Sequence, residues 1–218
     1  MSLYTFSSHD ALPSLRVINE LKIEECTDIS LLSYLAGKKE SEIISRLAND
    51  NLAFVAYING QPAAFGWMAR GKGIIGELGH EFILPISNRY LWNFRTVERF
   101  RGLGIYPLLL QYIMQYEGIK ANRFWIIHAP ENQASLKGIR KAGFRYLGNL
   151  YTYEGQAFLD APAVSGEEIQ LIEEMDFRLS IKSSPSCWSC SSPFIKREEE
   201  ICCCLAEGKF CTSRPEIV

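Results

Sequence analysis

The spacing of apolar and polar residues changes along the chain, and each change predicts a different element. Residues 15–20 (LRVINE) alternate between the two kinds and predict a strand. Residues 30–49 carry apolar side chains three and four positions apart, which predicts two short helices with Gly37 as the break. Two apolar runs, 52–58 and 61–68, flank an Asn-Gly dipeptide. Because this dipeptide tolerates the positive φ angles of a tight turn, we expect a β-hairpin there.

The middle of the chain continues with strands and helices in alternation. Two strands joined by a turn are predicted at 73–84 and 89–97. A helix is predicted at 107–116, where apolar residues share one face and Pro107 suits the first turn. The remaining elements are a short buried parallel strand, a helix and a further strand at 124–127, 134–141 and 145–153. This order indicates a mixed α/β sheet.

Composition places the chain among globular proteins with a core, since 47% of its residues are hydrophobic and 22% are charged. No run of about 18 apolar residues is present, so we expect no membrane span and no membrane partner. The first 13 residues lack the basic and then apolar pattern of a secretory signal, and we therefore expect a cytoplasmic protein.

Charge is distributed unevenly within a net charge of −2. From Tyr151 onward there are 6 basic and 12 acidic residues, which leaves 23 − 6 = 17 basic and 25 − 12 = 13 acidic residues before it. The earlier portion, at +4, therefore suits a small anionic ligand better than the rest. An excess of this size is too weak for a nucleic-acid surface, so no nucleic-acid partner is expected.

The most informative motif is the heptapeptide Arg-Gly-Leu-Gly-Ile-Tyr-Pro at 101–107, between a predicted strand and a predicted helix. A glycine-rich turn that opens a helix directs several backbone N–H groups into one concavity, where the helix dipole also favours an anion. It lacks the Gly-Lys-Ser/Thr of nucleotide-triphosphate loops and the third glycine of the dinucleotide fingerprint. A purely structural strand-to-helix turn is the alternative interpretation of the same glycines.

The residues around this turn resemble the coenzyme A signature of the GCN5-related N-acetyltransferase (GNAT) family. In that signature, Arg or Gln, two residues, Gly, one residue, and Gly or Ala open a helix. Arg101 and Gly104 match the first two fixed positions, and Tyr106 stands where a small residue is usual. A frame that begins at Arg99 fits in full, but the Arg101 frame places Thr96 where the family's strand ends.

A second stretch, from Asn132 to the Gly143-Phe144 pair, resembles the family's later motif at the right distance. The resemblance covers about residues 15–155. It implies a mixed, mostly antiparallel central sheet with splayed parallel strands flanked by helices. We expect a GNAT acetyltransferase domain over residues 1–160, followed by an acidic, Cys-rich segment over 161–218.

By this resemblance, acetyl-CoA is the cosubstrate and lies where the two parallel strands splay. A free strand edge would pair with the pantetheine amides, and the glycine-rich turn would hold the pyrophosphate. The cofactor-binding residues that it implies are Phe94, Arg95, Thr96, Arg101, Gly102, Leu103, Gly104, Ile105, Tyr106 and Asn132.

The reaction implied is direct attack of an amine on the thioester, which needs a proton acceptor for the amine and a donor for the thiolate. The family's usual tyrosine and glutamate positions hold Ile139 and Leu91 here. Glu77 and Glu81, on the strand predicted at 73–84, are the substitutes for the base, and a solvated strand face is the alternative. A GNAT-fold sensor or scaffold that binds acyl-CoA without chemistry is therefore the second functional hypothesis.

Six of the seven cysteines lie in the last part of the chain. The Cys187–Cys190 pair has the two-residue spacing of half a zinc site, and a second half would take one cysteine of 202–204 with Cys211. Our prediction is a zinc site of Cys187, Cys190, Cys204 and Cys211, with an iron–sulfur cluster or free thiols as the alternatives. This segment lies outside the GNAT resemblance.

Overall fold

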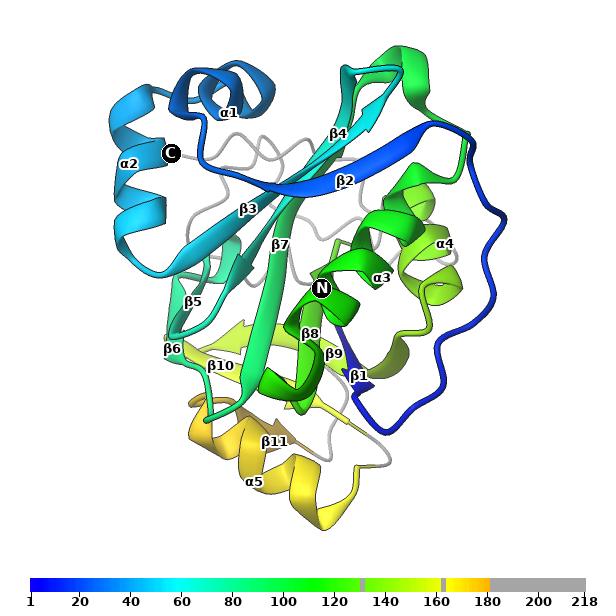
Figure 1. Ribbon diagram of the computed structural model, residues 1–218. Coiled ribbons are helices and arrows are strands. Elements are labelled where there is room, and N and C mark those ends of the chain that lie inside the picture. Colours follow the sequence, from blue (N-terminus) through cyan, green and yellow to red (C-terminus); the bar gives the residue numbers. More distant parts are fainter. Residues whose placement is uncertain (130–131, 162–163, 181–218) are drawn as a thin grey trace, which may run out of the picture.

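A nine-stranded mixed sheet forms the centre of the computed structural model, which describes residues 1–129, 132–161 and 164–180 (Figure 1). Its strands lie in the order β11-β10-β9-β1-β8-β7-β4-β3-β2. In chain order they are β1 (Ser2–Ser7), β2 (Leu21–Cys26), β3 (Asn51–Ile58), β4 (Gln61–Ala69), β7 (Asn88–Thr96), β8 (Arg123–His128), β9 (Arg145–Tyr153), β10 (Gln156–Asp160) and β11 (Arg178–Ser180). A separate two-stranded sheet pairs β5 (Lys72–Ile75) with β6 (His80–Ile83).

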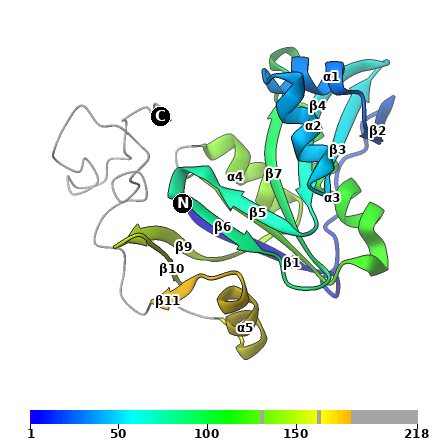
Figure 2. The same ribbon diagram turned by 90° about the vertical axis from the view of Figure 1, so that its left-hand side faces the viewer.

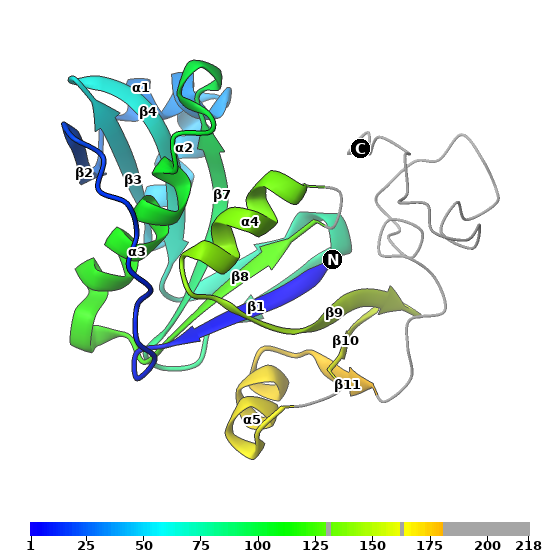
Figure 3. The ribbon, with the colours of Figure 1, turned by 90° about the vertical axis from the view of Figure 1, so that its right-hand side faces the viewer.

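Helices cover both faces of the large sheet. They are α1 (Ile29–Ala36), α2 (Glu40–Ala48), α3 (Ile105–Glu117), α4 (Gln133–Lys141) and α5 (Gly166–Glu174). Figure 2 views the sheet from the side of α1, α2 and the β5–β6 hairpin, and Figure 3 from the side of α3 and α4. Consecutive residues of β7 show this division, because Leu91 packs in the α3 core while Tyr90 packs with the β5–β6 hairpin.

Most neighbouring strands are antiparallel, and the described sheet has two parallel pairs, β7–β8 and β10–β11. The predicted mixed, mostly antiparallel α/β fold is therefore confirmed. Because β11 joins the large sheet, that sheet extends beyond Asp160. The domain boundary after residue 160 stays a prediction.

Several local predictions are confirmed. β3 and β4 form the expected hairpin, and its turn residues Asn59 and Gly60 have φ angles of 49° and 74°. The break between α1 and α2 falls at Gly37, which adopts a left-handed conformation with φ of 64°. In both places the residue type suits the positive φ that the turn requires.

Two predicted strands are wrong. Residues 15–20 form no strand, and the strand begins at Leu21; Val17, an apolar residue of the alternating pattern, is 80% exposed. Residues 73–84 are not one strand beside β7. The chain reverses through a 3₁₀ turn at Gly76–Leu78 and Gly79, whose φ is 60°, so that β5 and β6 pair with each other. β7 lies instead between β4 and β8.

One central strand was not predicted at all. β1 lies between β8 and β9 and is antiparallel to both. Its side chains reach both faces of the sheet: Leu3 packs in one core, and Tyr4 and Phe6 pack in the α3 core. A strand buried on both faces does not show the polar alternation that marks a half-exposed strand.

Candidate functional site

The site begins where β7 and β8 separate. The two strands pair in parallel from Asn88 opposite Arg123 to Leu91 opposite Ile126. Beyond Leu91, β7 continues to Thr96 with β4 as its partner among the described strands (Figure 3). Among the described strands, the edge of β7 that faces away from β4 is therefore without a partner from Trp92 to Thr96, and its backbone N–H and C=O groups can pair with a ligand.

A β-bulge accompanies this separation. The register between β4 and β7 shifts between Phe65 and Trp67, and Asn93 has a φ of 53°. The ring of Phe94 lies directly on Gly66, where an added Cβ would be 2.0 Å from a ring carbon. A bulge bends and twists the strand that carries it, which accounts for the departure of β7 from β8.

The glycine-rich turn follows β7 and opens α3. Gly102 and Gly104 have φ angles of 81° and 85°, and Gly104 is the N-cap of α3 without a side-chain cap. Apart from the neighbouring residues of the chain, no described atom lies within 4 Å of the place that a Cβ would take at either glycine, so the turn is open rather than packed. The first N–H groups of α3 have no partner within the helix, and the helix dipole favours an anion at that end.

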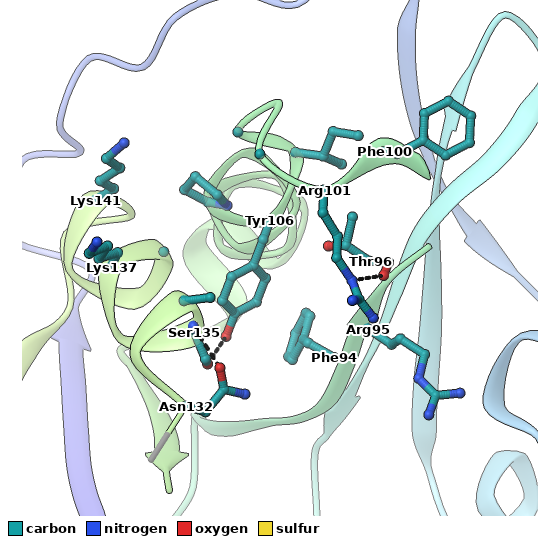
Figure 4. Close-up of a pocket in the computed structure, with 16 residues that line it drawn as sticks. Phe94, Arg95, Thr96, Phe100, Arg101, Tyr106, Asn132, Ser135, Lys137 and Lys141 are labelled. Atoms are coloured by element: carbon teal, nitrogen blue, oxygen red, sulfur yellow. Dashed lines mark hydrogen bonds between the residues drawn. The ribbon is translucent and has the colours of Figure 1, made fainter. Parts of the chain in front are cut away.

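A cavity of about 670 Å³ joins these features (Figure 4). It is lined by the end of β7, the glycine-rich turn, the first turn of α3 and one side of α4. All the predicted cofactor-binding residues line it except Leu103, which is 53% exposed. A cavity of this size is typical of small-molecule and cofactor sites.

Tyr106, one of the predicted cofactor-binding residues, lines this cavity and extends between α3 and α4. Its ring centroid is 5.4 Å from that of Phe94, and its hydroxyl is 3.5 Å from Ser135 Oγ on α4 (Figure 4). A Cβ on Gly138 would lie 2.3 Å from the Tyr106 ring, so the ring fills the space that this glycine leaves. Burial raises the pKa of Tyr106 far more than the Ser135 hydrogen bond lowers it, so the phenol stays protonated and remains a donor.

Asn132 stands at the N-terminus of α4 and fixes its start. Its side-chain oxygen accepts from the backbone N–H of Ser135 at 3.0 Å, and its carbonyl oxygen accepts from His128 Nε2 at 2.8 Å. Because the side-chain oxygen of Asn132 is used in the cap, its side-chain NH₂ group is the one left to face the cavity.

Basic residues line two sides of the cavity. Arg95 and Arg101 come from β7 and the turn, and Lys137 and Lys141 come from α4. Among the residues that the structure describes, the lining includes no Asp, Glu or His. Arg101 Nε donates to the carbonyl oxygen of Thr96 at 3.4 Å and its guanidinium is 3.8 Å from Glu98. The cavity is therefore electropositive, as expected for an anionic ligand.

Several residues of α4 line the cavity although they were not predicted from the sequence to do so; they include Ser135, Lys137, Gly138 and Lys141. The two lysines are four positions apart on a predicted helix, so the sequence held the signal that they share a face. The sequence did not show that this face looks onto the glycine-rich turn.

Glu77 and Glu81 lie elsewhere than predicted. Glu77 is in the 3₁₀ turn, and Glu81 is on β6, paired with β5 and forming an ion pair with Lys72. Their hairpin packs against the other face of β7, with the rings of Phe82 and Tyr90 5.4 Å apart. Neither glutamate lines the cavity.

The predicted zinc ligands Cys187, Cys190, Cys204 and Cys211 lie outside the described residues. Among the residues that are described, no group of three or more His, Cys, Asp or Glu side chains is placed to hold a metal ion. Over the same residues, no helix is both long and apolar enough to cross a bilayer.

Comparison with known proteins gives similarities of structure. No protein-family profile matches the sequence, and no curated protein matches it. A GCN5-related N-acetyltransferase from Kribbella flavida is similar at a TM-score of 0.47 and 14% identity, over 66% of this chain and 53% of its own, so this chain corresponds to about half of that protein. The ribosomal-protein-S18-alanine N-acetyltransferase from Escherichia coli has a TM-score of 0.48 and 16% identity, over 62% and 83%.

A third similar structure is a GNAT family acetyltransferase from Elizabethkingia anophelis with acetyl-CoA bound. Its TM-score is 0.46 at 16% identity, over 62% of this chain and 82% of its own. At 14% to 16% identity these similarities concern the fold, and the structures similar to this chain include GNAT-family acetyltransferases.

Proposed function

We propose that this protein is an N-acetyltransferase that transfers an acetyl group from acetyl-CoA to an amine. The observation that supports this most strongly is one continuous cavity that joins a free strand edge to an open glycine-rich turn at a helix N-terminus. The first feature suits a chain of amides and the second suits a pyrophosphate, and coenzyme A contains both groups in succession.

In this proposal, the pantetheine arm lies along β7. The backbone groups of residues 94–96 pair with its amides in the way that an added strand would. The pyrophosphate rests on the N–H groups of residues 102–106, with Arg101 beside it. Ser135 and the amide nitrogen of Asn132 stand across the cleft as further hydrogen-bonding groups.

The chemistry is attack of a neutral amine nitrogen on the thioester carbonyl carbon, followed by loss of the thiolate. The described lining of the cavity holds no carboxylate or histidine, so we place the proton acceptor on the side from which the amine enters. We keep Glu77 and Glu81 as the proposed bases, acting through water from the hairpin on the other face of β7.

Thermal unfolding with and without acetyl-CoA tests the cofactor. Binding should stabilise the protein by about 2.7 kcal/mol at a hundredfold excess over the dissociation constant. Gly104→Glu should abolish this shift, since its carboxylate would occupy the open turn. Gly155→Glu is the matched control, because Gly155 also has a positive φ (74°) and open space but lies at the β9–β10 turn. No shift in the parent protein at millimolar acetyl-CoA would refute the proposal.

A binding protein without chemistry is the second candidate, and it is favoured by Ile139 and Leu91 at the positions where the resembled family usually has a tyrosine and a glutamate. The two candidates differ in one measurement: free coenzyme A released from acetyl-CoA in the presence of a broad panel of amines. Release above the amine-only rate supports the transferase. Thermal stabilisation by acetyl-CoA without release supports the sensor.

A further inference from the structure

Lys137 and Lys141 form a second basic wall of the cavity, separate from the glycine-rich turn. They stand one turn apart on α4 and both line the cavity, across from Arg101 (Figure 4). Neither forms an ion pair with any residue that the structure describes. Two like charges four positions apart on a helix repel each other, so an anion held between them would relieve an unfavourable contact.

We propose that Lys137 and Lys141 bind the 3′-phosphate of coenzyme A, an inference that rests on the proposed function. The open turn at Gly102 and Gly104 accounts for the pyrophosphate, and the edge of β7 accounts for the arm that leads from it to the thioester. The remaining part of the cofactor is the adenosine with its 3′-phosphate, on the other side of the pyrophosphate. The remaining basic wall of the cavity is the face of α4.

The assignment defines the class of acyl donor. A 3′-phosphate is present in free coenzyme A and absent from 3′-dephospho-coenzyme A. It is also absent from phosphopantetheine attached to a carrier protein, which has no adenosine. A site that gains affinity from Lys137 and Lys141 therefore selects free acyl-coenzyme A over protein-bound acyl groups.

The test compares the dissociation constants of coenzyme A and 3′-dephospho-coenzyme A, measured by titration calorimetry on the full chain. Each exposed charge contact changes affinity by a factor of roughly two to five. The two lysines together therefore predict a preference of about tenfold for coenzyme A. In K137Q/K141Q this preference should fall to about twofold or less, while the affinity for the dephospho form stays within about twofold of its parent value.

Arg140→Gln is the matched control, since Arg140 is a basic, exposed residue on α4 that does not line the cavity. It should keep the full preference. Equal affinity of the parent protein for the two ligands would overturn the proposal, as would an equal loss of both in K137Q/K141Q. Binding of neither ligand to the parent protein would instead overturn the proposed function, which separates the two failures.

Discussion

Charged side chains are paired differently at the two ends of the β7 and α3 elements. At one end, β7 pairs with β8, and Arg89 of β7 forms an ion pair with Glu117, the last residue of α3, whose side chain is fully buried. At the other end, β7 has left β8, and Arg95 lines an open cavity and forms no ion pair with any described residue. Within one pair of elements, the buried Arg89 has a buried counter-charge, whereas the exposed Arg95 has none among the described residues.

The matched end is organised around the Glu117 carboxylate, whose side chain is 0% exposed. Arg89 Nε donates to it at 2.5 Å, and Arg70, from the end of β4, donates at 2.6 Å. Arg89 also donates to the carbonyl oxygens of Asn88 and Lys120. Because a buried charge is tolerated only when it is paired and hydrogen-bonded, this network fixes the end at which β7, β8 and α3 converge.

Glu117→Gln should have the largest effect on stability. It keeps the shape of the side chain but removes the carboxylate that both Arg70 and Arg89 contact, and among the described residues leaves Arg70 with only the more distant Asp50, at 4.0 Å. Breaking a buried ion pair in this way costs about 3–5 kcal/mol. Urea unfolding measures the loss, and Glu98→Gln, an exposed glutamate beside the cavity, is the control and should stay within about 0.5 kcal/mol. Equal effects of the two substitutions would remove the distinction between the two ends.

The pH dependence of stability should report the same network. Burial raises the pKa of Glu117, but the hydrogen bonds from Arg70 and Arg89 outweigh it, so its pKa lies below the ordinary 4.5. A carboxylate with a lowered pKa in the folded state stabilises the protein fully above about pH 4.5 and loses this contribution as the pH falls further. Denaturant unfolding between about pH 3 and 6 should show a steeper acid loss in the parent than in Glu117→Gln.

Gly138→Ala tests the contact across the cavity. Alanine is favoured over glycine in a helix by about 1 kcal/mol, but here its Cβ would lie 2.3 Å from the Tyr106 ring. Overpacking of this kind costs about 1–3 kcal/mol, so we expect a net loss of roughly 1 kcal/mol in urea unfolding. In a Tyr106→Ala background the same change should become stabilising. A loss that persists there would show that Tyr106 is not the obstacle.

The parts of the fold set by local chemistry were predictable from the sequence. The Asn59-Gly60 turn, the Gly37 break and the glycines before α3 each show their conformation through residue type. Position in the sheet was not predictable in the same way. β1 pairs with β8, and Thr5 donates to the carbonyl of Phe124, 119 positions along the chain. Nothing in a six-residue strand specifies so distant a partner.

In the candidate site, too, the features set by a contiguous stretch were predictable and those set by distant residues were not. Its loop and strand edge were predicted from a contiguous stretch, 94–106, and the structure brings them to one cavity. The errors concern residues whose role depends on what faces them. The strand of Glu81 was predicted to pair with β7, but β7 pairs with β4, and β6 pairs with β5. The contact of Tyr106 with Gly138 depends in the same way on a second helix that its own sequence does not specify.

The smallest expected effect belongs to the unmatched charges of the cavity. Arg95→Gln removes an exposed guanidinium that forms no ion pair with a described residue, so the free energy of unfolding should change by less than about 0.5 kcal/mol. Lys137→Gln removes the repulsion between Lys137 and Lys141 and should stabilise the protein by about 0.2–0.5 kcal/mol at low salt. This gain should shrink in 1 M salt, where the screening length falls to about 3 Å. A destabilisation above 1 kcal/mol in either variant would mean that these side chains support the fold, and the basic walls of the cavity would then be structural like the Glu117 network.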